Sequence, residues 1–493
     1  MKLKSLLLAF FLCVFSVYAQ ESSKSEYIKI NESTYCYTLD NGLSLFIAEN
    51  HSVPLAYVEI AVRAGGITQT KENAGLFHLY EHMMFKGNKK FANSGAVQKA
   101  LSDMGTASWN GTTGIECVNY FFTIPKGELE NGLDFWNNAI RFPLMDKDEF
   151  EVEKKVVISE IQGNVSNPDR YAGYYFQKKL FPEAPWQLDP SGSVKDIENA
   201  TVEKLRQIQK TYYIPSNAAL FVGGDVSHKE VYELVKKIYG SWSDNGVKVE
   251  TIRAVSVHQK EEPFDKTFYC VFPYDKIPPQ YASVSIYYRG PDCDFDENGT
   301  YAADLFTYYL RNPDGKVVKD LIADKNLMIP SVDDLGLGYA TRRRTGLTSF
   351  SAGMMNATNK IADRTVYLKE KIDGILEGYL NIENIVPENE KAAIVRRLND
   401  DRILESETFM GMLNVLRYSW VTNSVEYYQE YISNVQNMTD DDIKEYISRY
   451  HYKKNPLVLL IVNSEVYKKQ KKDFDRLGFV ELNANDAFWW NED

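Results

Sequence analysis

The first half of the chain contains the stretch GLFHLYEHMMFKG, residues 75–87. Its apolar residues recur at helical spacing, which predicts a helix over residues 74–85. Within this helix His78 and His82 are four positions apart, so both imidazoles leave from the same face. Two imidazoles placed in this way can bind one cation. Glu81 neighbours both on that face and is placed to take a proton from a metal-bound water rather than to bind the metal.

This pattern of histidines has an ordinary alternative explanation. An amphipathic helix that exposes two histidines to solvent would give the same letters without a metal. However, the chain contains only 6 histidines, so the order H-x-x-E-H, which reverses the zincin order H-E-x-x-H, is rare by chance. A catalytic zinc site also needs a third protein ligand from another segment.

The segment EFEVEKKVVISEI, residues 149–161, offers that third ligand. It predicts a helix on which Glu153 and Glu160, seven positions apart, share a face. Two carboxylates on the inner side of a half-apolar helix are costly unless a cation neutralises them. A solvated acidic helix face is the alternative. The apolar positions expected to face the core are Val156, Val157 and Ile161.

Segments around the first helix have the pattern of strands. Residues 38–47 read TLDNGLSLFI, and the Asn-Gly pair supplies a hairpin turn. Residues 54–62 alternate like a half-buried strand, and residues 120–124 form another strand before Pro125. The first half therefore reads as strands interleaved with helices.

The second half of the chain repeats features of the first. Residues 201–217 and 439–455 both run from Thr through an amphipathic helix to Asn and lead into an apolar strand. Upstream, EVEK at 151–154 matches ENEK at 388–391 at nearly the same offset. A long offset shared by separate segments indicates two similar domains rather than a solenoid, although amphipathic helices can match by chance. The domain boundary is expected within residues 243–263.

The composition is that of an ordinary soluble globular protein. The 493 residues are 44% apolar and 25% charged, with a formal charge of −12. These values exclude a disordered chain and a multi-span membrane protein. An acidic chain without a stripe of Lys and Arg also argues against nucleic acid as the main partner.

Residues 1–20 have the features of a secretory signal. Lys2 and Lys4 precede a short apolar run, and Ala19 offers a cleavage site. The run is too short for a comfortable membrane span, so a cleaved signal peptide over residues 1–19 is predicted, with an uncleaved anchor as the alternative. No other stretch is apolar enough to span a bilayer. We therefore expect export to the periplasm or the extracellular space.

Two stretches of the chain resemble the pitrilysin/insulinase family of zinc metallopeptidases, the inverzincins. The likeness is strongest over residues 75–87, continues through residues 153–161 and extends over most of the chain after the signal. In that family a glutamate ligand follows H-x-x-E-H after roughly 70–80 residues, and Glu160 lies 78 residues after His82. The resemblance implies Zn²⁺ held by His78, His82 and Glu160, with Glu81 as general base and Glu153 as a second acidic catalytic residue just outside the metal shell.

The resemblance also implies a fold of two similar α+β domains. Each would be a mostly antiparallel sheet covered by helices, and the pair would form half of a clamshell-like dimer. By the repeat offset, Arg397 takes the place of Glu160, so one metal site per chain is expected. Asn110 falls, on a looser pattern, where the family pairs an extended substrate with a sheet edge. The implied divisions are a signal peptide at 1–19, a zinc-bearing domain at 26–243, a linker at 244–263 and a second domain without metal ligands at 264–493.

The chain departs from the family at the residues that bind the substrate carbonyl. Active members supply an Arg and a Tyr seven residues apart from a C-terminal domain, and here Ile322 and Ile329 stand at those places. Arg206 and Tyr213 are the one pair at that spacing and lie in the wrong half. Loss of an oxyanion donor commonly costs about 2.7–4 kcal/mol in the barrier. Some short members divide the zinc site and the Arg/Tyr pair between two chains, so the resemblance implies the zinc-bearing subunit of a heterodimer.

The expected function is that of a zinc-dependent endopeptidase subunit that hydrolyses peptides or unfolded segments. A second pitrilysin-family subunit that carries the Arg/Tyr pair would complete it. A homodimer with a substitute donor is one alternative. Another is a catalytically silent scaffold subunit of an envelope complex that keeps its zinc site. A structural zinc protein fits poorly, because such sites have four ligands and the sequence offers three.

Overall fold

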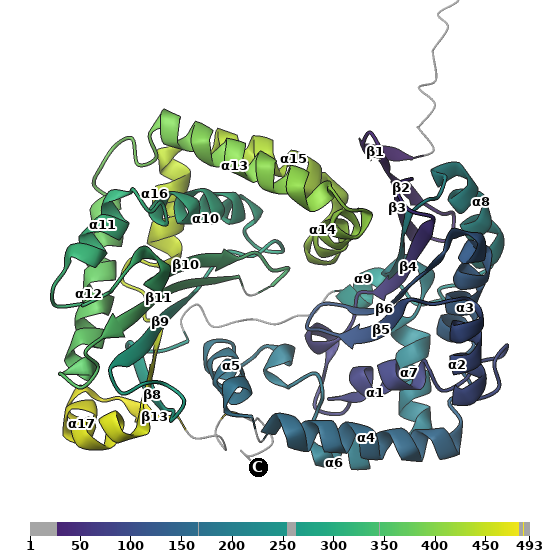
Figure 1. Ribbon diagram of the computed structural model, residues 1–493, viewed down its shortest axis with the longest axis horizontal. Coiled ribbons are helices and arrows are strands. Elements are labelled where there is room, and N and C mark those ends of the chain that lie inside the picture. Colours follow the sequence, from purple (N-terminus) through teal and green to yellow (C-terminus); the bar gives the residue numbers. More distant parts are fainter. Residues whose placement is uncertain (1–26, 166, 254–262, 345, 483–486, 488–493) are drawn as a thin grey trace, which may run out of the picture.

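The molecule consists of two sheets with their helices, which stand at opposite sides of the structure (Figure 1). The predicted signal peptide, residues 1–19, lies outside the described part of the chain. Within that part, no helix has both the length and the apolar character needed to cross a membrane. The computed structural model describes residues 27–165, 167–253, 263–344, 346–482 and 487.

The first sheet contains seven strands in the order β1-β2-β3-β7-β4-β6-β5. All neighbouring strands are antiparallel except β3 and β7. The sequence AALFVGG of β7 is buried along its whole length, as expected for a central strand, and β5 forms one edge. The strands are β1 (Ile28–Asn31), β2 (Thr34–Thr38), β3 (Ser44–Glu49), β4 (Leu55–Val62), β5 (Ser108–Thr113), β6 (Val118–Pro125) and β7 (Ala218–Gly224).

The second sheet contains six strands in the order β10-β11-β9-β12-β8-β13. Its strands are β8 (Phe268–Pro273), β9 (Tyr281–Arg289), β10 (Leu335–Ala340), β11 (Leu347–Met355), β12 (Leu457–Val462) and β13 (Val480–Glu481). Five strands match the first sheet in order and direction: β8-β12-β9-β11-β10 follows β3-β7-β4-β6-β5, with one parallel pair at the same place. The prediction of two similar, mostly antiparallel α+β domains is confirmed.

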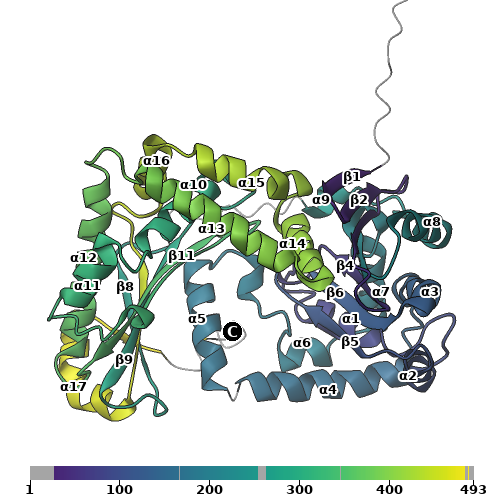
Figure 2. The same cartoon turned by 45° about the horizontal axis from the view of Figure 1, so that its top comes forward.

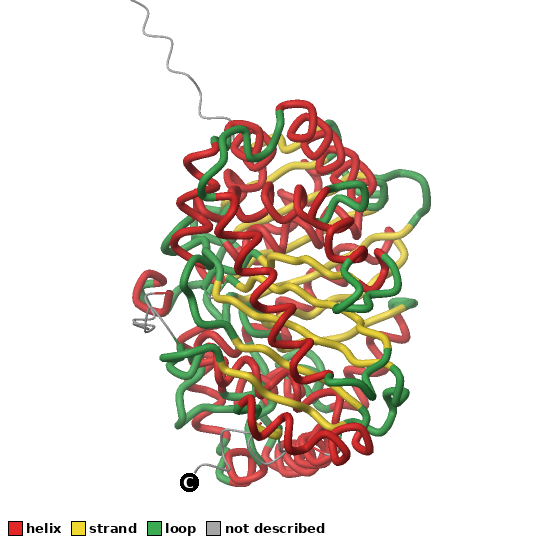
Figure 3. The backbone as a smooth tube through the Cα atoms, turned by 90° about the vertical axis from the view of Figure 1, so that its left-hand side faces the viewer, coloured by secondary structure: helices red, strands yellow, loops and turns green. Residues whose placement is uncertain are grey.

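One face of each sheet is covered by helices from its own half, as Figure 3 shows for the strands and the helices in front of them. The helices that contribute core residues to the first sheet are α1 (Leu76–Met83), α2 (Ser94–Asp103), α3 (Leu129–Arg141), α4 (Lys147–Val165), α6 (Val194–Glu198), α7 (Val202–Tyr212) and α8 (His228–Tyr239). Those of the second sheet are α10 (Glu297–Leu310), α11 (Lys316–Ala323), α12 (Ile361–Tyr379), α13 (Glu388–Ser406), α15 (Val425–Asn437), α16 (Asp440–Tyr450) and α17 (Ser464–Leu477).

The other face of each sheet is covered by a helix from the opposite half (Figures 1 and 2). Helix α14 (Phe409–Thr422) packs its apolar residues against β3, β4 and β7 of the first sheet. In the same way α5 (Pro168–Leu180) packs against β8 and β12 of the second sheet. Each of these helices follows a helix of 19 residues, α4 (Lys147–Val165) or α13 (Glu388–Ser406). This exchange joins the two halves through apolar contacts.

The local predictions around the site are confirmed. The hairpin expected at 38–47 is formed by β2 and β3, with Gly42 in the left-handed region at φ 85°. The expected strands are β4 and β6, and the expected helices over 74–85 and 149–161 are α1 and α4. Thr201 and Thr439 cap α7 and α16 by accepting a bond from a backbone N–H.

Two sequence-based expectations require correction, and both involve the register of a long helix. Val156 is 40% exposed, because the buried stripe of α4 follows Val157 and Ile161 and leaves Val156 to one side. The comparable helices α4 and α13 begin at residues 147 and 388, which are 241 apart. At this offset Asp401, not Arg397, takes the place of Glu160, so the EVEK match had placed the repeat four residues out of register.

The predicted linker at 244–263 contains a short helix, α9 (Val249–Arg253). Residues 254–262 lie outside the described part of the chain. The first sheet ends at Gly224 and the second begins at Phe268, so the described strands fall on either side of this segment.

Candidate metal centre

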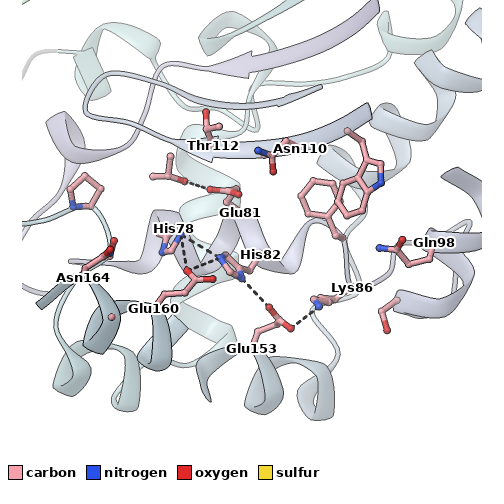
Figure 4. Close-up of a pocket in the computed structure, with 18 of the residues that line it drawn as sticks. His78, Glu81, His82, Lys86, Gln98, Asn110, Thr112, Glu153, Glu160 and Asn164 are labelled. Carbon is pink, nitrogen blue, oxygen red and sulfur yellow. Dashed lines mark hydrogen bonds and ion pairs between the residues drawn. The ribbon is translucent and has the colours of Figure 1, made fainter. Parts of the chain in front are cut away.

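Helix α1 directs His78 and His82 into a pocket of about 690 Å³ that α4 and β5 also line (Figure 4). The rotation of the helix is fixed by its opposite face, where Leu79, Tyr80 and Met83 are fully buried in the first core. The helix starts beside Gly75, whose φ is 77°. A Cβ at this glycine would lie 2.6 Å from the backbone oxygen of Ser191, so only glycine lets this loop pack against the start of α1.

Three donor atoms from α1 and α4 converge in this pocket. The Nε2 atoms of His78 and His82 are 3.3 Å apart, and each lies 3.7 Å from Oε2 of Glu160. A tetrahedral zinc ion with bonds of about 2.0–2.1 Å separates its ligand atoms by roughly 3.4 Å. The residues present therefore fit one such cation. Among the described residues this is the one group of three His, Cys, Asp or Glu side chains close enough to share a metal.

Glu153 binds the ring nitrogen of His82 that is not one of the three donor atoms. Its Oε2 accepts a hydrogen bond from Nδ1 of His82 at 3.0 Å, and its Oε1 lies 2.6 Å from Nζ of Lys86. The bond to Nδ1 leaves Nε2 free for the cation, which is the usual second-sphere arrangement for a metal-binding histidine. Burial would raise the pKa of Glu153, but the hydrogen bonds from His82 and Lys86 outweigh it and lower that pKa.

The two histidines differ in their electrostatic surroundings. Burial, helped by the neighbouring His82, lowers the pKa of His78 to about 4, so His78 is neutral and able to bind a metal at neutral pH. Burial also disfavours the charged form of His82. There the hydrogen bond to Glu153 and the charges of Glu160 and Glu81 dominate and raise the pKa. His78 Nδ1 is buried and has no hydrogen-bond partner among the described residues.

Glu81 points away from the three donors, toward β5 (Figure 4). Its Oε2 accepts a hydrogen bond from Oγ1 of Thr113 at 2.8 Å. A Cβ on Gly111 would come within 2.7 Å of its Oε1, so the carboxylate occupies space that only glycine leaves open. Burial raises the pKa of Glu81, which the bond from Thr113 partly opposes. A carboxylate with a raised pKa beside a metal pocket is suited to proton transfer.

The edge strand β5 forms the wall of the pocket opposite α4. Within the described chain its strand partner is β6, and its outer edge pairs with no other strand. Asn110, the residue predicted at this edge, lies on β5, is exposed and lines the pocket together with Trp109. An extended peptide could add to such an edge by main-chain hydrogen bonds.

The structure brings the five predicted site residues into one pocket. All of them line it, on α1 and α4. Glu153 is buried as expected, whereas the side chain of Glu160 is 46% exposed at the mouth. Their roles stay predictions. The five are His78, Glu81, His82, Glu153 and Glu160.

Sequence reasoning missed the contribution of β5 to the position of Glu81. Thr113 and Gly111 are two apart and therefore point to the same face of the strand. Alternation along β5 could have grouped them, but nothing local in the sequence indicates that this face meets Glu81. Lys86 was quoted in the deciding stretch without a role, and the structure gives it one as the ion-pair partner of Glu153.

The residues predicted at the places of the family's Arg and Tyr belong to the packing of the second core. Ile329 is buried in the second core, and Ile322 packs against the same core. Arg206 and Tyr213, the one pair at the family's spacing, make hydrogen bonds within the first domain. The Tyr213 hydroxyl is buried 2.9 Å from that of Tyr120, and Arg206 donates to the backbone oxygen of Leu144 at 2.9 Å.

Fold and pocket together define a class: a protein of two similar α+β domains with an inverted zinc motif in the first. The sequence model "Insulinase (Peptidase family M16)" matches residues 45–185, and the model "Peptidase M16 inactive domain" matches residues 199–383. The chain belongs to peptidase family M16. The second match begins at residue 199, before β7 completes the first sheet, so the two matches do not divide the chain where the sheets do.

Curated relatives with protease and peptidase names match less than half of this sequence. The zinc protease PqqE of Helicobacter pylori is 28% identical over 206 residues, which is 41% of this chain and 46% of the relative. The mitochondrial-processing peptidase subunit beta of Dictyostelium discoideum is 23% identical over 237 residues, 48% of this chain and 50% of the relative. The matched segments thus span half or less of these relatives.

Solved structures share the fold at lower identity. The periplasmic protease PqqL of Escherichia coli superimposes with a TM-score of 0.74 at 17% identity, over 92% of this chain and 50% of that one. A protease from Helicobacter pylori gives a TM-score of 0.67 at 20% identity, over 86% of this chain and 98% of that one. At these identities the likeness shows the two-domain fold alone.

Proposed function

We propose that this chain is the zinc-bearing subunit of a metalloendopeptidase that hydrolyses peptides or unfolded segments. The observation that carries the proposal is the convergence of His78, His82 and Glu160 within 4.8 Å of one another, with Glu81 held beside them. Three protein ligands with an open fourth position are typical of catalytic rather than structural zinc. Membership of family M16 supports a zinc protease at this coarse level.

A zinc ion bound there would polarise the scissile carbonyl and lower the pKa of a bound water. The residues of the chain would do the rest. Glu81 accepts the proton of the attacking water and passes it to the leaving nitrogen. Glu153 keeps His82 in the tautomer that exposes Nε2. The free edge of β5 pairs with the substrate main chain, which tolerates varied sequences.

We further propose that a second subunit completes the site. By the sequence-based alignment of residues 321–329, Ile322 and Ile329 stand in for the family's Arg and Tyr, and both pack in or against the second core. The superposition on 50% of the longer PqqL chain supports a partner of similar size, either a second pitrilysin-family subunit with the Arg/Tyr pair or a second copy of this chain. Export to the periplasm or the extracellular space belongs to the same proposal.

One observation favours a second candidate, a catalytically silent scaffold subunit of an envelope complex that keeps its zinc site. At the aligned places the described second half has isoleucines instead of the Arg and Tyr that bind the oxyanion in the family, and such a donor is commonly worth about 2.7–4 kcal/mol in the barrier. Both candidates bind zinc, so metal content does not distinguish them. Peptide cleavage distinguishes them, because only the peptidase subunit is expected to support it.

The test is hydrolysis of unfolded peptides by the purified chain, alone and mixed with an M16 chain that carries an Arg and a Tyr seven residues apart. The Glu81→Gln variant is the control. We expect cleavage in the mixture and a loss of about 10²–10⁴-fold in Glu81→Gln with zinc content unchanged. Cleavage by the chain alone would favour the homodimer. No cleavage in either case would favour the scaffold.

A further inference from the structure

The second half of the chain reaches into the first sheet through Arg417. This residue lies on α14, which packs on the face of the sheet opposite α1. Its Nη1 donates to Oε1 of Glu59 at 2.9 Å. Glu59 lies on β4 and is fully buried. A buried carboxylate of this kind needs a charged partner, and the other half of the chain supplies it.

A run of hydrogen bonds continues from Glu59 to the edge of the sheet. Asn119 on β6 donates through Nδ2 to Oε1 of Glu59 at 2.6 Å. Thr112 on β5 in turn donates its hydroxyl to Oδ1 of Asn119. Thr112 and Asn119 are direct partners in the register of the two strands. The hydroxyl of Tyr57 adds a third donor to Glu59 at 2.9 Å. The run therefore links α14 to β5 through groups on one face of the sheet.

The other face of β5 holds Glu81. Thr113 donates to its carboxylate, and Gly111 makes room for it. Successive side chains of a strand point to opposite faces, so Thr112 and Thr113 hold the same piece of strand from two sides. Since β5 has one strand neighbour in the described sheet, its position depends more on such side-chain contacts than that of a central strand does.

We propose that Arg417 is a positioning residue for the peptidase reaction. Through Glu59, Asn119 and Thr112 it fixes β5, and through β5 it fixes the carboxylate of Glu81 and the edge that receives the peptide. The catalytic consequence rests on the proposed function. The mechanical coupling between α14 and β5 does not, and it can be measured without any substrate.

The experiment compares Arg417→Met and Thr112→Val, singly and together, by hydrogen exchange of residues 108–113, by kcat and KM, and by zinc affinity. Thr112→Val keeps a β-branched side chain at an exposed strand position and cuts the run without burying an unpaired charge. Thr112→Val therefore tests the coupling between α14 and β5 even if Arg417→Met fails to fold. The exposed Arg397→Met on α13 is the matched control. Arg417→Lys keeps the charge and should recover part of the effect.

We expect exchange in β5 to become about tenfold faster in each single variant, the effect of one lost hydrogen bond of ordinary strength. kcat should fall and KM should rise, because β5 both holds Glu81 and receives the peptide, while zinc affinity stays unchanged; the double variant should be no worse than Arg417→Met. Unchanged β5 exchange, or fully additive losses, would overturn the inference. Faster exchange in a protein that cleaves nothing would support the coupling while contradicting the proposed function.

Discussion

At the residue scale, the position of Glu81 depends on a missing side chain. A Cβ on Gly111 would lie only 2.7 Å from Oε1 of Glu81, so any larger residue would displace the carboxylate. Glu81 is the residue to which we assign proton transfer, so the glycine is expected to matter for catalysis although it has no functional group. The three metal donors line the same pocket as Glu81 and Gly111.

Gly111→Ala should therefore lower kcat by at least tenfold while zinc binding is retained, because a displaced carboxylate no longer meets the attacking water. Gly127→Ala is the control, since a Cβ at Gly127 meets nothing within 4 Å. Steady-state cleavage and metal analysis of the two variants check this. Equal activity in both would show that Glu81 does not need its present position.

Glu153 allows a second prediction about a single residue. Removing its charge weakens the bond to Nδ1 of His82 and the ion pair with Lys86, so Glu153→Gln should bind zinc about 10–100-fold more weakly. Competition with a chelator of known affinity measures this. Glu151→Gln, on the same helix with its side chain 56% exposed, should leave the affinity unchanged. A similar loss in both variants would point to general charge rather than to the contact with His82.

Much of the metal site could be predicted from the sequence, and the reason is periodicity. His78 and His82, and likewise Glu153 and Glu160, lie on two helices where fixed spacing determines the shared face. Thr113 and Gly111 could not be predicted, because their meeting with Glu81 depends on how β5 crosses α1. No spacing within one element encodes that crossing.

At the element scale, two hairpin loops meet between the halves. Glu116, in the loop after β5, accepts a hydrogen bond from the backbone N–H of Arg343, in the loop after β10, at 3.0 Å. Asp294 pairs with the side chains of Arg343 and Arg344 at 3.3 and 2.7 Å. Burial raises the pKa of Glu116 to about 7, although Arg342 and the backbone donors oppose the shift.

This contact should make stability depend on pH. A carboxyl whose pKa is raised in the folded state contributes stability that is fully present below about pH 4.5 and is lost as the pH rises through about 7. The stability of the wild type relative to Glu116→Gln, which keeps an acceptor oxygen, should fall by about 3 kcal/mol between pH 4.5 and 8. Chemical denaturation across this range measures it. A constant difference would contradict the raised pKa.

The bounds of most elements near the site could be predicted, because turn residues and apolar periodicity mark them. The register of α13 against α4 could not. EVEK and ENEK resemble each other by composition, but α4 and α13 begin at residues 147 and 388, and this spacing decides which residues correspond. Asp401 therefore replaces Arg397 as the counterpart of Glu160.

At the scale of the whole molecule, each half covers a sheet of the other. The repeat in the sequence predicts two similar domains, but it cannot indicate that α5 and α14 exchange places, because either helix could bury its apolar side on its own sheet. Their contacts, and the loop around Glu116, join the second half to the sheet whose edge strand β5 lines the metal pocket. A second domain without metal ligands is thus tied to the first.

Truncation of a contact on α14 should consequently destabilise the first sheet. Leu413 is fully buried against that sheet, so Leu413→Ala is expected to lower the free energy of unfolding by about 2–5 kcal/mol. Leu404→Ala, 60% exposed on α13, should change it little. Denaturant unfolding gives both values. A change in Leu413→Ala as small as that in Leu404→Ala would show that the contact of α14 does not stabilise the first sheet.

The central claim is that one divalent cation is bound between α1 and α4. Zinc-edge X-ray absorption on the purified chain tests it most directly. The account predicts one zinc per chain with two imidazole nitrogens and a carboxylate oxygen at about 2.0–2.2 Å, and the loss of that oxygen in Glu160→Gln. A chain that binds no zinc, or a coordination sphere unchanged when His78, His82 and Glu160 are replaced, would contradict it.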